Sequence, residues 1–584
     1  MFTTLRKFFG DLWMLTRPYW VSEDRVRALA LLAAIVGINL GLVYITVLIN
    51  EWNNAFYNSL QDKDYEAFQS QIVRFSWLAA LYIAGAVYQL YLNQMLQIRW
   101  RRWLTARYVD SWLDERAYYR MQLMDKGTDN PDQRIQEDLK LFVAQTLSLT
   151  LGLMTSVVTL GSFVTILWGL SGDLEIPFGD STIVVPGYML WAAIVYAIVG
   201  SWLTHRIGRP LVKLNFEQQR YEADFRFSLV RLRENAEGVA LYRGEADERR
   251  SLMDRFGWVV NNWRAIMDRQ KKLTWLTAGY GQIAVIFPFV VAAPRFFAGA
   301  IELGGLMQTA SAFGQVQSAL SWFVDAYPTL ADWKATVDRL TGFQAATMNA
   351  RNLPQTDRGP VLTPGPAAAL SVEGVALDLP DGRALLADVN LRIENGESVL
   401  IDGPSGSGKS TLFRAFAGIW PFGHGRIAMP RDARVLFLPQ RPYLPLGTLR
   451  AVVSYPASPG AFSDDAIIAA LKDSMLAPLV DRLDENQHWA LQLSPGEQQR
   501  LAIARALLHK PNWLFLDEAT SSVDEPTETR LYQLVRERLP ATTLVSIGHR
   551  PSLAAFHNRR LAIRRRDNGP AEVVPWTAPA AAAG

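Results

Sequence analysis

The chain has 584 residues and a formal net charge of only +3, so it lacks the strong basicity that would indicate a nucleic-acid-binding protein. It contains no cysteine, which excludes disulfides, thiolate metal sites and cysteine catalysis. Apolar residues make up 49% of the chain and are concentrated, with most of the 19 tryptophans, before residue 340, which indicates two domains of different character.

Six apolar segments before residue 340 are each long enough to cross about 30 Å of hydrocarbon as a helix. They are 28–49, 75–96, 141–170, 183–203, 273–297 and 303–327. The third and the sixth contain enough Ser, Thr and Gln to resemble soluble amphipathic helices. The sequence therefore predicts a membrane α-helical domain with six transmembrane helices.

Lysine and arginine are unevenly distributed among the loops: fifteen lie in 205–272 and nine in 97–140, but none lies in 169–183. Because cytoplasmic loops carry the excess of these residues, we expect both termini and the C-terminal domain to lie in the cytoplasm. The first 27 residues also contain acidic residues, and the apolar segment after them is longer than that of a secretory signal. We therefore expect no cleaved targeting peptide.

The segment 205–272 is too polar for a membrane span and too periodic for a loose loop. We expect helices that extend below the bilayer and turn back. The turns best placed to touch the C-terminal domain are 130–132, a helix-start pattern, and 238–245, which two glycines bracket. For most individual charges here, a solvated helix face is the alternative interpretation.

Polar residues of the third and sixth segments recur at steps of three and four, so they share one helical face in each. Two interpretations stay open: a hydrophilic translocation pathway, or helix packing, which small and hydroxylated residues also favour. The glutamines favour a pathway, because an amide facing lipid is costly and a tight seam does not need its bulk. The candidate pathway residues are Gln145, Ser148, Thr155, Thr159, Gln308, Ser311, Gln315 and Ser318.

The composition changes after Gly342. We assign 1–342 to the membrane domain, the proline-marked stretch 343–369 to a linker, and 370–568 to a soluble α/β nucleotide-binding domain. The last stretch, 569–584, is rich in Ala and Pro and is predicted to be a disordered tail.

The run from Gly403 to Thr411 reads GPSGSGKST and matches the phosphate-loop pattern GxxxxGKS. A strand-like stretch, 398–401, precedes it and a helix-like stretch follows it, as such a loop requires. Backbone N–H groups and the helix N-terminus would surround the phosphates, Lys409 would reach the β- and γ-phosphates, and Ser410 would ligate Mg²⁺. The candidate phosphate-binding residues are Gly403, Ser405, Gly406, Ser407, Gly408, Lys409, Ser410 and Thr411.

Two further strands end in residues suited to the same chemistry. The apolar strand 514–516 ends in Asp517 and Glu518, and the strand 543–547 is followed by Gly548 and His549. The first carboxylate suits Mg²⁺, and the second could orient the water that attacks the γ-phosphate. The alternative is a solvated acidic strand end and a structural histidine.

Between the phosphate loop and the first of these strand ends lies LSPGEQQR, from Leu493 to Arg500. Its pattern predicts a helix start with Ser494 as N-cap, Pro495 at the first helical position and Glu497 completing a capping box. Such a start offers N–H groups and a hydroxyl to an anion. An ordinary capped helix is the alternative.

These motifs, in this order and with Gln440 and Asp524, resemble the motif set of ABC-transporter ATPases. The resemblance implies ATP and Mg²⁺ as cofactors and assigns catalysis to Glu518 and His549. It implies metal ligation by Ser410, Gln440 and Asp517, and further nucleotide contacts. Those contacts come from Gln440, Ser494, Gly496, Glu497 and Asp524. It also implies a homodimer, because the signature serine of this family contacts the γ-phosphate bound by the other subunit.

Two positions depart from that family. Pro495 stands where the signature has glycine, which removes one N–H from the helix start. The family also places an aromatic residue before the phosphate loop to stack on adenine, whereas this neighbourhood contains Leu377, Asp378, Leu379 and Pro380. The residue that holds the base is therefore not identified by the resemblance.

In the membrane half, four stretches resemble the SbmA/BacA-like membrane domain, which is related to subfamily D of the half-size ABC transporters. They are 50–64, 100–105, 129–138 and 306–340. The resemblance implies a bacterial inner-membrane homodimer of exporter-type topology in contact with membrane lipid, and an importer of peptides or other bulky hydrophilic solutes. Acyl-CoA or lipid transport of the subfamily D type is the main alternative.

The sequence thus predicts an ATP hydrolase that couples hydrolysis to alternating access, with no nucleic acid as partner. Two other classes stay open: a membrane-anchored ATP-dependent regulator or nucleic-acid ATPase, and a binding scaffold with an inactive ATPase. The six spans speak against the first, and intact Lys409, Asp517, Glu518 and His549 against the second.

Overall fold

The computed structural model describes residues 2–124, 130–178, 181–352, 359–365, 368–566 and 569–576. The chain divides into two compact units. Met1–Asp110 and Asn130–Gln344 belong to the first, which we call the helical unit. Ser111–Asp129 and Ala345–Gly584 belong to the second, which we call the sheet unit.

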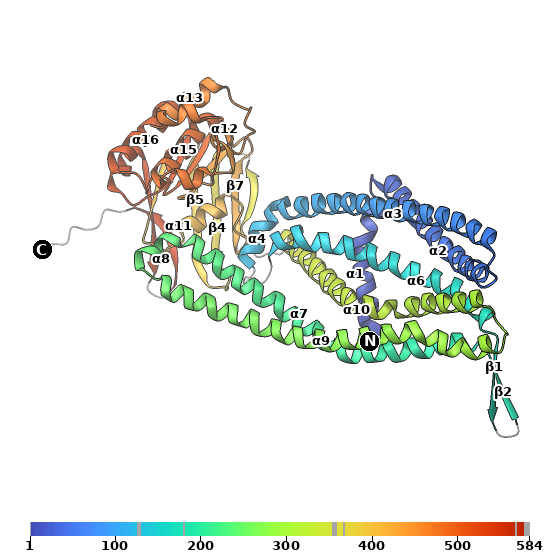
Figure 1. Cartoon of the computed structure of the whole chain (residues 1–584). Coiled ribbons are helices and arrows are strands. Elements are labelled where there is room, and N and C mark those ends of the chain that lie inside the picture. Colours follow the sequence, from blue (N-terminus) through green and yellow to red (C-terminus); the bar gives the residue numbers. More distant parts are fainter. Residues whose placement is uncertain are drawn as a thin grey trace. The chain divides into compact units, whose positions relative to one another are not determined.

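Long helices build the helical unit (Figure 1). They are α1 (Phe2–Trp20), α2 (Arg25–Gln61), α3 (Tyr65–Leu113), α6 (Leu139–Ser171), α7 (Tyr188–Glu234), α9 (Glu245–Phe297) and α10 (Leu303–Asn352), of which α3 and α10 end in the sheet unit. Shorter helices are η1 (Asp114–Arg116), α4 (Ala117–Met124), α5 (Pro131–Gln133), the π-helical turn η2 (Arg134–Asp138) and α8 (Ala236–Tyr242).

Five helical stretches of the described chain are long and apolar enough to cross a membrane. They are Arg25–Gln61, Tyr65–Met124, Pro131–Ser171, Tyr188–Glu234 and Glu245–Phe297. The predicted sixth span lies on α10, which is helical as expected but does not reach the same mean hydropathy. Its polar residues explain the difference, and the sixth span stays a prediction.

The predicted start of the fourth span is wrong. Residues 183–186 belong to strand β2 (Ser181–Pro186), which pairs antiparallel with β1 (Asp173–Phe178) in a hairpin between α6 and α7 (Figure 1). The β-branched run Ile183–Val185 favours a strand, and Gly187, with φ of +64°, then lets the chain turn into α7.

Helices α7 and α9 pack side by side and carry the charged segment 205–272, as predicted. Buried Asn262 on α9 donates to the Leu214 carbonyl oxygen and to Gln218 Oε1 on α7, both at 2.9 Å. The short helix α8 connects the two long helices, and it exposes Leu241 and Tyr242.

The sheet unit is built on one ten-stranded sheet in the order β3-β7-β4-β5-β14-β13-β6-β12-β11-β8. The strands are β3 (Val361–Gly365), β4 (Ala369–Asp378), β5 (Ala384–Glu394), β6 (Ser398–Asp402), β7 (Gly423–Pro430), β8 (Val435–Leu438), β11 (Trp513–Asp517), β12 (Thr543–Ile547), β13 (Arg559–Arg566) and β14 (Gly569–Pro575). Neighbouring strands from β13 to β8 run parallel, so their carboxyl ends meet at one edge.

Helices cover both faces of this parallel part. They are α11 (Lys409–Phe416), α12 (Leu449–Ser454), α13 (Asp464–Asp473), η4 (Ala477–Arg482), α14 (Trp489–Gln492), α15 (Pro495–His509), α16 (Glu525–Arg538) and η5 (Pro551–Phe556). The two-residue strands β9 (Gly447–Thr448) and β10 (Asn486–Gln487) pair with each other outside this sheet. Alternate residues enter opposite cores: Leu514 packs with α12 to α16, whereas Phe515 packs with α11 and β4. The strands are therefore buried on both faces, as a parallel sheet requires.

Two predicted boundaries are wrong. Most of the described part of the predicted linker is ordered, because α10 continues to Asn352, β3 pairs with β7, and β4 begins at Ala369. The predicted tail begins with a strand, since β14 pairs with β13 and touches β5 through Ala571 and Leu386. Composition suggested disorder, but these residues satisfy the hydrogen bonds of neighbouring strands. Residues 353–358, 366–367 and 577–584 of those two predictions lie outside the described residues.

A short segment before residue 130 belongs to the sheet unit. It is α4, upstream of residues 130–132: Leu123 packs against the sheet core and Arg116 Nη1 donates to the Ala417 carbonyl oxygen at 2.8 Å. Residues 130–132 belong to the helical unit, where Pro131 begins α5, and their contact with the C-terminal domain stays a prediction. The predicted helix start at Asn130 and Pro131 is thereby confirmed.

Candidate nucleotide site

The phosphate loop lies at the carboxyl edge of the parallel strands. It follows β6 and leads into α11, and Gly408, with φ of +100°, is the N-cap residue of that helix. Glycine adopts this left-handed conformation without strain. The predicted strand, loop and helix are thereby confirmed, and the N–H groups at the start of α11 face the edge where the other strands end.

Lys409 is buried beneath the loop, with 6% of its surface exposed. Its Nζ donates to the carbonyl oxygens of Gly403 and Pro404, at 2.6 and 3.0 Å. Burial lowers the pKa of the Lys409 amine, while Glu518, Asp402 and Asp517 raise it. The loop also holds the buried Ser407 hydroxyl, which finds no hydrogen-bond partner among the described residues. A polar cradle with an unpaired hydroxyl fits a phosphate group.

Oxygen donors suited to a magnesium ion lie beside the loop. Ser410 Oγ donates to Asp517 Oδ1 at 3.0 Å, and Gln440 follows the end of β8. Burial raises the pKa of the Asp517 carboxyl, and the Ser410 hydrogen bond opposes that shift. Mg²⁺ keeps several waters and binds through one or two carboxylates plus phosphate oxygens, so this sparse set of hard oxygen donors fits it.

Glu518 stands between two side chains from neighbouring strand ends. Gln440 Nε2 donates to Glu518 Oε2 at 3.0 Å, and His549 Nε2 lies 3.2 Å from Glu518 Oε1. His549 Nδ1 is 3.4 Å from Asp402 Oδ1, so the imidazole bridges two carboxylates. Glu518 itself has φ of +48°, an uncommon conformation for a non-glycine residue that often marks a functional position.

The predicted capping box at the start of α15 is confirmed. Ser494 Oγ accepts from the Glu497 N–H at 3.3 Å, and Glu497 Oε2 accepts from the Ser494 N–H at 2.9 Å. Hydrogen bonds from Ser494 lower the pKa of Glu497. Pro495 occupies the first helical position, where its missing N–H disturbs no intrahelical bond. Ser494 is exposed, and Gly496 lies close to Ser522.

Two residues of this region have structural partners. Asp524 Oδ1 caps α16 by accepting from the Thr527 N–H at 3.2 Å. Hydrogen bonding to the Thr527 side chain, and then to its N–H, lowers the Asp524 pKa. Gln499, which the site prediction omitted, is buried and donates to the Gln440 carbonyl oxygen at 3.0 Å and to Ser521 Oγ at 3.2 Å. Its place directly after LSPGEQ is the only local hint of this role. Gln499 therefore ties α15 to the segments that carry Gln440 and Glu518.

These groups border a cavity of about 700 Å³. Residues 405–411, which follow β6, line it, and Gln440, Asp517 and Glu518 line it from the strand ends on the β11 and β8 side of β6. On the other side of β6 it is lined by residues that the predicted site did not include: Leu379, Arg383, Ala384, Leu385, Arg565, Arg566, Gly569, Pro570 and Ala571. Five of them come from β13 and β14, and Gly569, Pro570 and Ala571 were not considered because they lie in the predicted tail. Ser494, Gly496, Glu497 and Asp524, all within the described chain, do not line it.

The polar stripes of the membrane helices meet partners inside the helical unit. Asn39 Nδ2 donates to Thr155 Oγ1 at 2.9 Å, while Asn50 and Asn54 donate to the carbonyl oxygen and Oε1 of buried Gln308. Gln308 and Thr155 thus connect α2 with α10 and α6, as the packing interpretation expects, while their role in a pathway stays a prediction. Ser148 and Ser318 are exposed, and Thr159, Ser311, Gln145 and Gln315 are half-buried.

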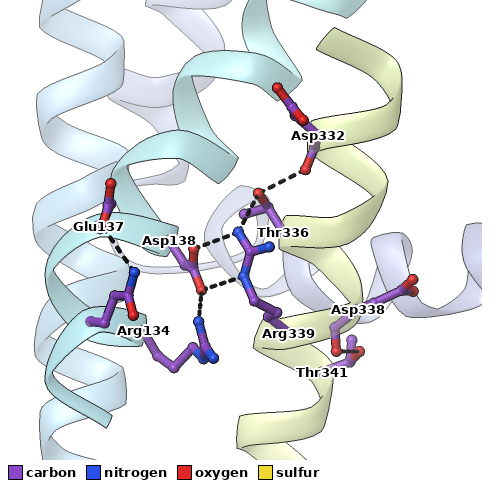
Figure 2. Close-up of polar contacts among 9 residues, drawn as sticks. Arg134, Glu137, Asp138, Asp332, Thr336, Asp338, Arg339 and Thr341 are labelled. Atoms are coloured by element: carbon purple, nitrogen blue, oxygen red, sulfur yellow. Dashed lines mark hydrogen bonds and ion pairs between the residues drawn. The ribbon is translucent and has the colours of Figure 1, made fainter. Parts of the chain in front are cut away.

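Helices α6 and α10 are also joined by contacts outside the predicted set. Trp333 Nε1 donates to Thr146 Oγ1 at 2.8 Å, and the Trp322 ring packs on Gly152. Below them, Figure 2 shows Asp138 between two arginines. Arg339 donates from Nη2 to Asp138 Oδ1 at 2.7 Å and from Nε to Oδ2 at 2.9 Å, and Arg134 Nη1 donates to Oδ2 at 2.9 Å.

Comparison with known proteins supports both halves. A family model described as ABC transporter transmembrane region 2 matches residues 15–297, and one described as ABC transporter matches 386–521. The Escherichia coli inner membrane ABC transporter ATP-binding protein YddA is 34% identical, over 94% of this chain and 96% of its own. The human lysosomal cobalamin transporter ABCD4, a subfamily D relative, is 30% identical over 93% of this chain and 92% of its own length.

Among solved structures, a bacterial Atm1-family ABC exporter with ATP bound superposes with a TM-score of 0.70. The match covers 93% of this chain and 94% of that one, at 18% identity. At this identity the likeness concerns the fold, and it confirms the predicted exporter-type fold class.

Proposed function

We propose that the groups gathered at the carboxyl edge of β6, β8, β11 and β12 bind and hydrolyse MgATP. The chain belongs to the ABC transporter family, whose ATPase domain couples ATP hydrolysis to transport. The observation that carries this proposal is the convergence of Lys409, Asp517, Glu518 and His549, which the sequence separates by up to 140 residues, on one phosphate loop.

In the proposed mechanism, Lys409 Nζ exchanges its loop carbonyls for phosphate oxygens, a stronger charge-assisted contact. Ser410, Asp517 and Gln440 would hold Mg²⁺, which neutralises phosphate charge when bound. Glu518 orients a water toward the γ-phosphorus. The water oxygen bonds to phosphorus as the bond to the β–γ bridging oxygen breaks, giving ADP and inorganic phosphate. His549, between Glu518 and Asp402, positions the Glu518 carboxylate.

We also propose that the site is completed by a second copy of the chain. Ser494 is exposed at a helix start that can receive an anion, yet it lies outside the cavity of its own chain. A half-transporter of this fold is expected to dimerise, and in a symmetric dimer each Ser494 would face the partner's phosphate loop. Two ATP sites would then be shared.

For the cargo we propose a bulky hydrophilic solute, imported across a bacterial inner membrane with the ATPase in the cytoplasm. The exposed Ser148 and Ser318 and the half-buried Gln145 and Gln315 support a polar path. The SbmA/BacA-like resemblance favours peptides, and the name of the human relative favours cobalamin. Acyl-CoA, in keeping with subfamily D, is the second candidate.

The test is ATP-dependent accumulation of labelled peptide, cobalamin and acyl-CoA in inside-out and right-side-out vesicles. We expect a polar solute to accumulate and to stop accumulating in Gln145→Leu/Gln315→Leu, while ATP hydrolysis persists. The matched variant Gln308→Leu should instead lower thermal stability, since the Asn54 amide loses the Gln308 Oε1 acceptor. Stimulation of ATP hydrolysis by acyl-CoA alone would reject the polar cargo.

A further inference from the structure

The nucleotide cavity has two chemically different ends. At one end Gln440, Asp517 and Glu518 suit the triphosphate and its metal. Because the phosphate loop occupies the middle, the base and sugar of a nucleotide must extend toward the opposite end. Among the described lining residues there, none is aromatic: the apolar surface comes from Leu379, Leu385 and Pro570, and the nearest cations are arginines.

Strand register brings one of these arginines over the phosphate loop. β13 runs parallel to β6, with Ala562 opposite Asp402, so the next residues of β13 pass beside the loop that follows β6. Arg565 Nη2 donates to the Ser405 carbonyl oxygen at 3.2 Å. A Cβ atom placed on Gly406 would lie 3.2 Å from the same nitrogen. The guanidinium therefore lies directly on the loop, at the end of the cavity away from Glu518.

The neighbouring arginines are placed differently. Arg566 also lines the cavity, but its guanidinium forms an ion pair with Glu572 on β14. Arg564 does not line the cavity. Arg565 is exposed and has the loop carbonyl as its described contact, so it can turn toward a ligand at little cost.

We propose that the Arg565 guanidinium stacks on the nucleotide base, within the apolar surroundings of Leu379 and Leu385, and so replaces the aromatic platform that this chain lacks before its phosphate loop. A guanidinium is planar and delocalised, and it stacks on aromatic faces, whereas the lysine ammonium is a compact hydrated charge. This assignment rests on the nucleotide site proposed above and goes beyond it by naming the group that recognises the base.

The experiment measures binding to the purified full-length dimer in the Glu518→Gln background, which suppresses hydrolysis. Calorimetry gives the Kd of MgATP and of magnesium tripolyphosphate, which has no base. We expect Arg565→Ala to weaken MgATP binding by about tenfold or more, in line with the loss of one base-stacking contact, and to leave tripolyphosphate binding unchanged. Arg564→Ala, a matched change on the same strand, should leave both unchanged.

Replacement variants supply a second, independent measurement. Arg565→Tyr should restore MgATP binding to within a few-fold of the parent because a phenol ring also stacks, whereas Arg565→Lys should not. Equal weakening of MgATP and tripolyphosphate by Arg565→Ala, with rescue by lysine, would overturn the proposal in favour of a phosphate contact. Unchanged MgATP binding would reject Arg565 altogether, and a parent protein that binds no MgATP would reject the nucleotide site itself.

Discussion

Glu518 combines two features that suit the orientation of a water molecule. Its backbone conformation is uncommon, and its carboxylate contacts the Gln440 amide at 3.0 Å and the His549 imidazole at 3.2 Å. Three strand ends therefore fix one carboxylate beside Asp517 and Ser410, which we propose as metal ligands. Such positioning is what general-base and electrostatic catalysis require.

We expect Glu518→Gln to slow phosphate release by about 10²-fold or more while MgATP binding remains, because the amide keeps the shape but cannot take up a proton. Steady-state phosphate release and the Kd of MgATP measure the two effects. The matched variant Glu537→Gln, an exposed glutamate on α16, should behave like the unchanged protein. Near-normal turnover in Glu518→Gln would remove Glu518 from the mechanism.

His557 gives the sheet unit a pH-dependent stability. The imidazole is buried, with Nδ1 2.7 Å from the Leu553 carbonyl oxygen and Nε2 2.8 Å from Ser546 Oγ. Burial lowers its pKa from 6.5 to about 4, so the folded state keeps it neutral. Below about pH 6.5 His557 becomes protonated in the unfolded chain, whereas in the folded chain it stays neutral until the pH falls to about 4.

This contribution is therefore complete above pH 6.5 and is lost as the pH falls toward 4. Between pH 7 and pH 5 we expect a loss of about 2 kcal/mol in the stability of the sheet unit. Pulse proteolysis of the full chain in urea, detected through a C-terminal tag, measures it. His557→Gln should show a weaker dependence over this range, and an equal dependence in both proteins would contradict the assignment.

At the scale of elements, a buried ion network holds the start of α6 against α10. Asp138 is 2% exposed and accepts hydrogen bonds from Arg134 and Arg339 (Figure 2). The π-helical turn that ends at Asp138 places this carboxylate between the two helices. Removing one member of a buried pair leaves uncompensated charge, which is more costly than losing an exposed pair.

Asp138→Asn should consequently lower the apparent Tm of the detergent-purified protein by several degrees, corresponding to about 3 kcal/mol. The matched variant Lys334→Ala breaks an exposed pair with Asp338 on the same helix α10 and should cost less than about 1 kcal/mol. Thermal unfolding followed by tryptophan fluorescence compares them. Equal Tm values for the two variants would show that the Asp138 network contributes little.

At the scale of the whole molecule, the proposed shared sites require two chains. Lys409 belongs to the phosphate loop, and Ser494 lies on an exposed helix start outside the cavity of its own chain. A dimer mixed from Lys409→Ala and Ser494→Arg subunits would keep one intact composite site, whereas each homodimer would have none.

Co-expression of the two variants should therefore restore ATP hydrolysis to about a quarter of the wild-type level, because half of randomly assembled dimers are mixed and each has one of two sites. Hydrolysis by purified protein measures it. The control Ser458→Arg, an exposed serine elsewhere in the sheet unit, should stay active without a partner. If Ser494→Arg homodimers hydrolyse ATP like the unchanged protein, the sites are not shared.

Local patterns in the sequence were sufficient to predict the features that depend on neighbours along the chain. The strand, loop and helix around Gly403 to Thr411, the strands that end at Asp517 and Ile547, and the capping box at Ser494 were all predicted from local patterns. Hydrogen bonds three or four residues apart and the alternation of buried residues encode such elements directly. The long apolar helices followed from length and hydropathy in the same way.

Contacts between residues far apart in the sequence became known only from the tertiary structure. β14 is ordered because Ala571 lies opposite Leu386 and its strand completes the sheet, although its own composition resembles a tail. Gln308 packs on α2 because Asn50 and Asn54, more than 250 positions away, supply its hydrogen bonds. Arg565 reaches the phosphate loop through the register of β13 with β6. Contacts of this kind depend on register and packing between elements, which local patterns do not specify.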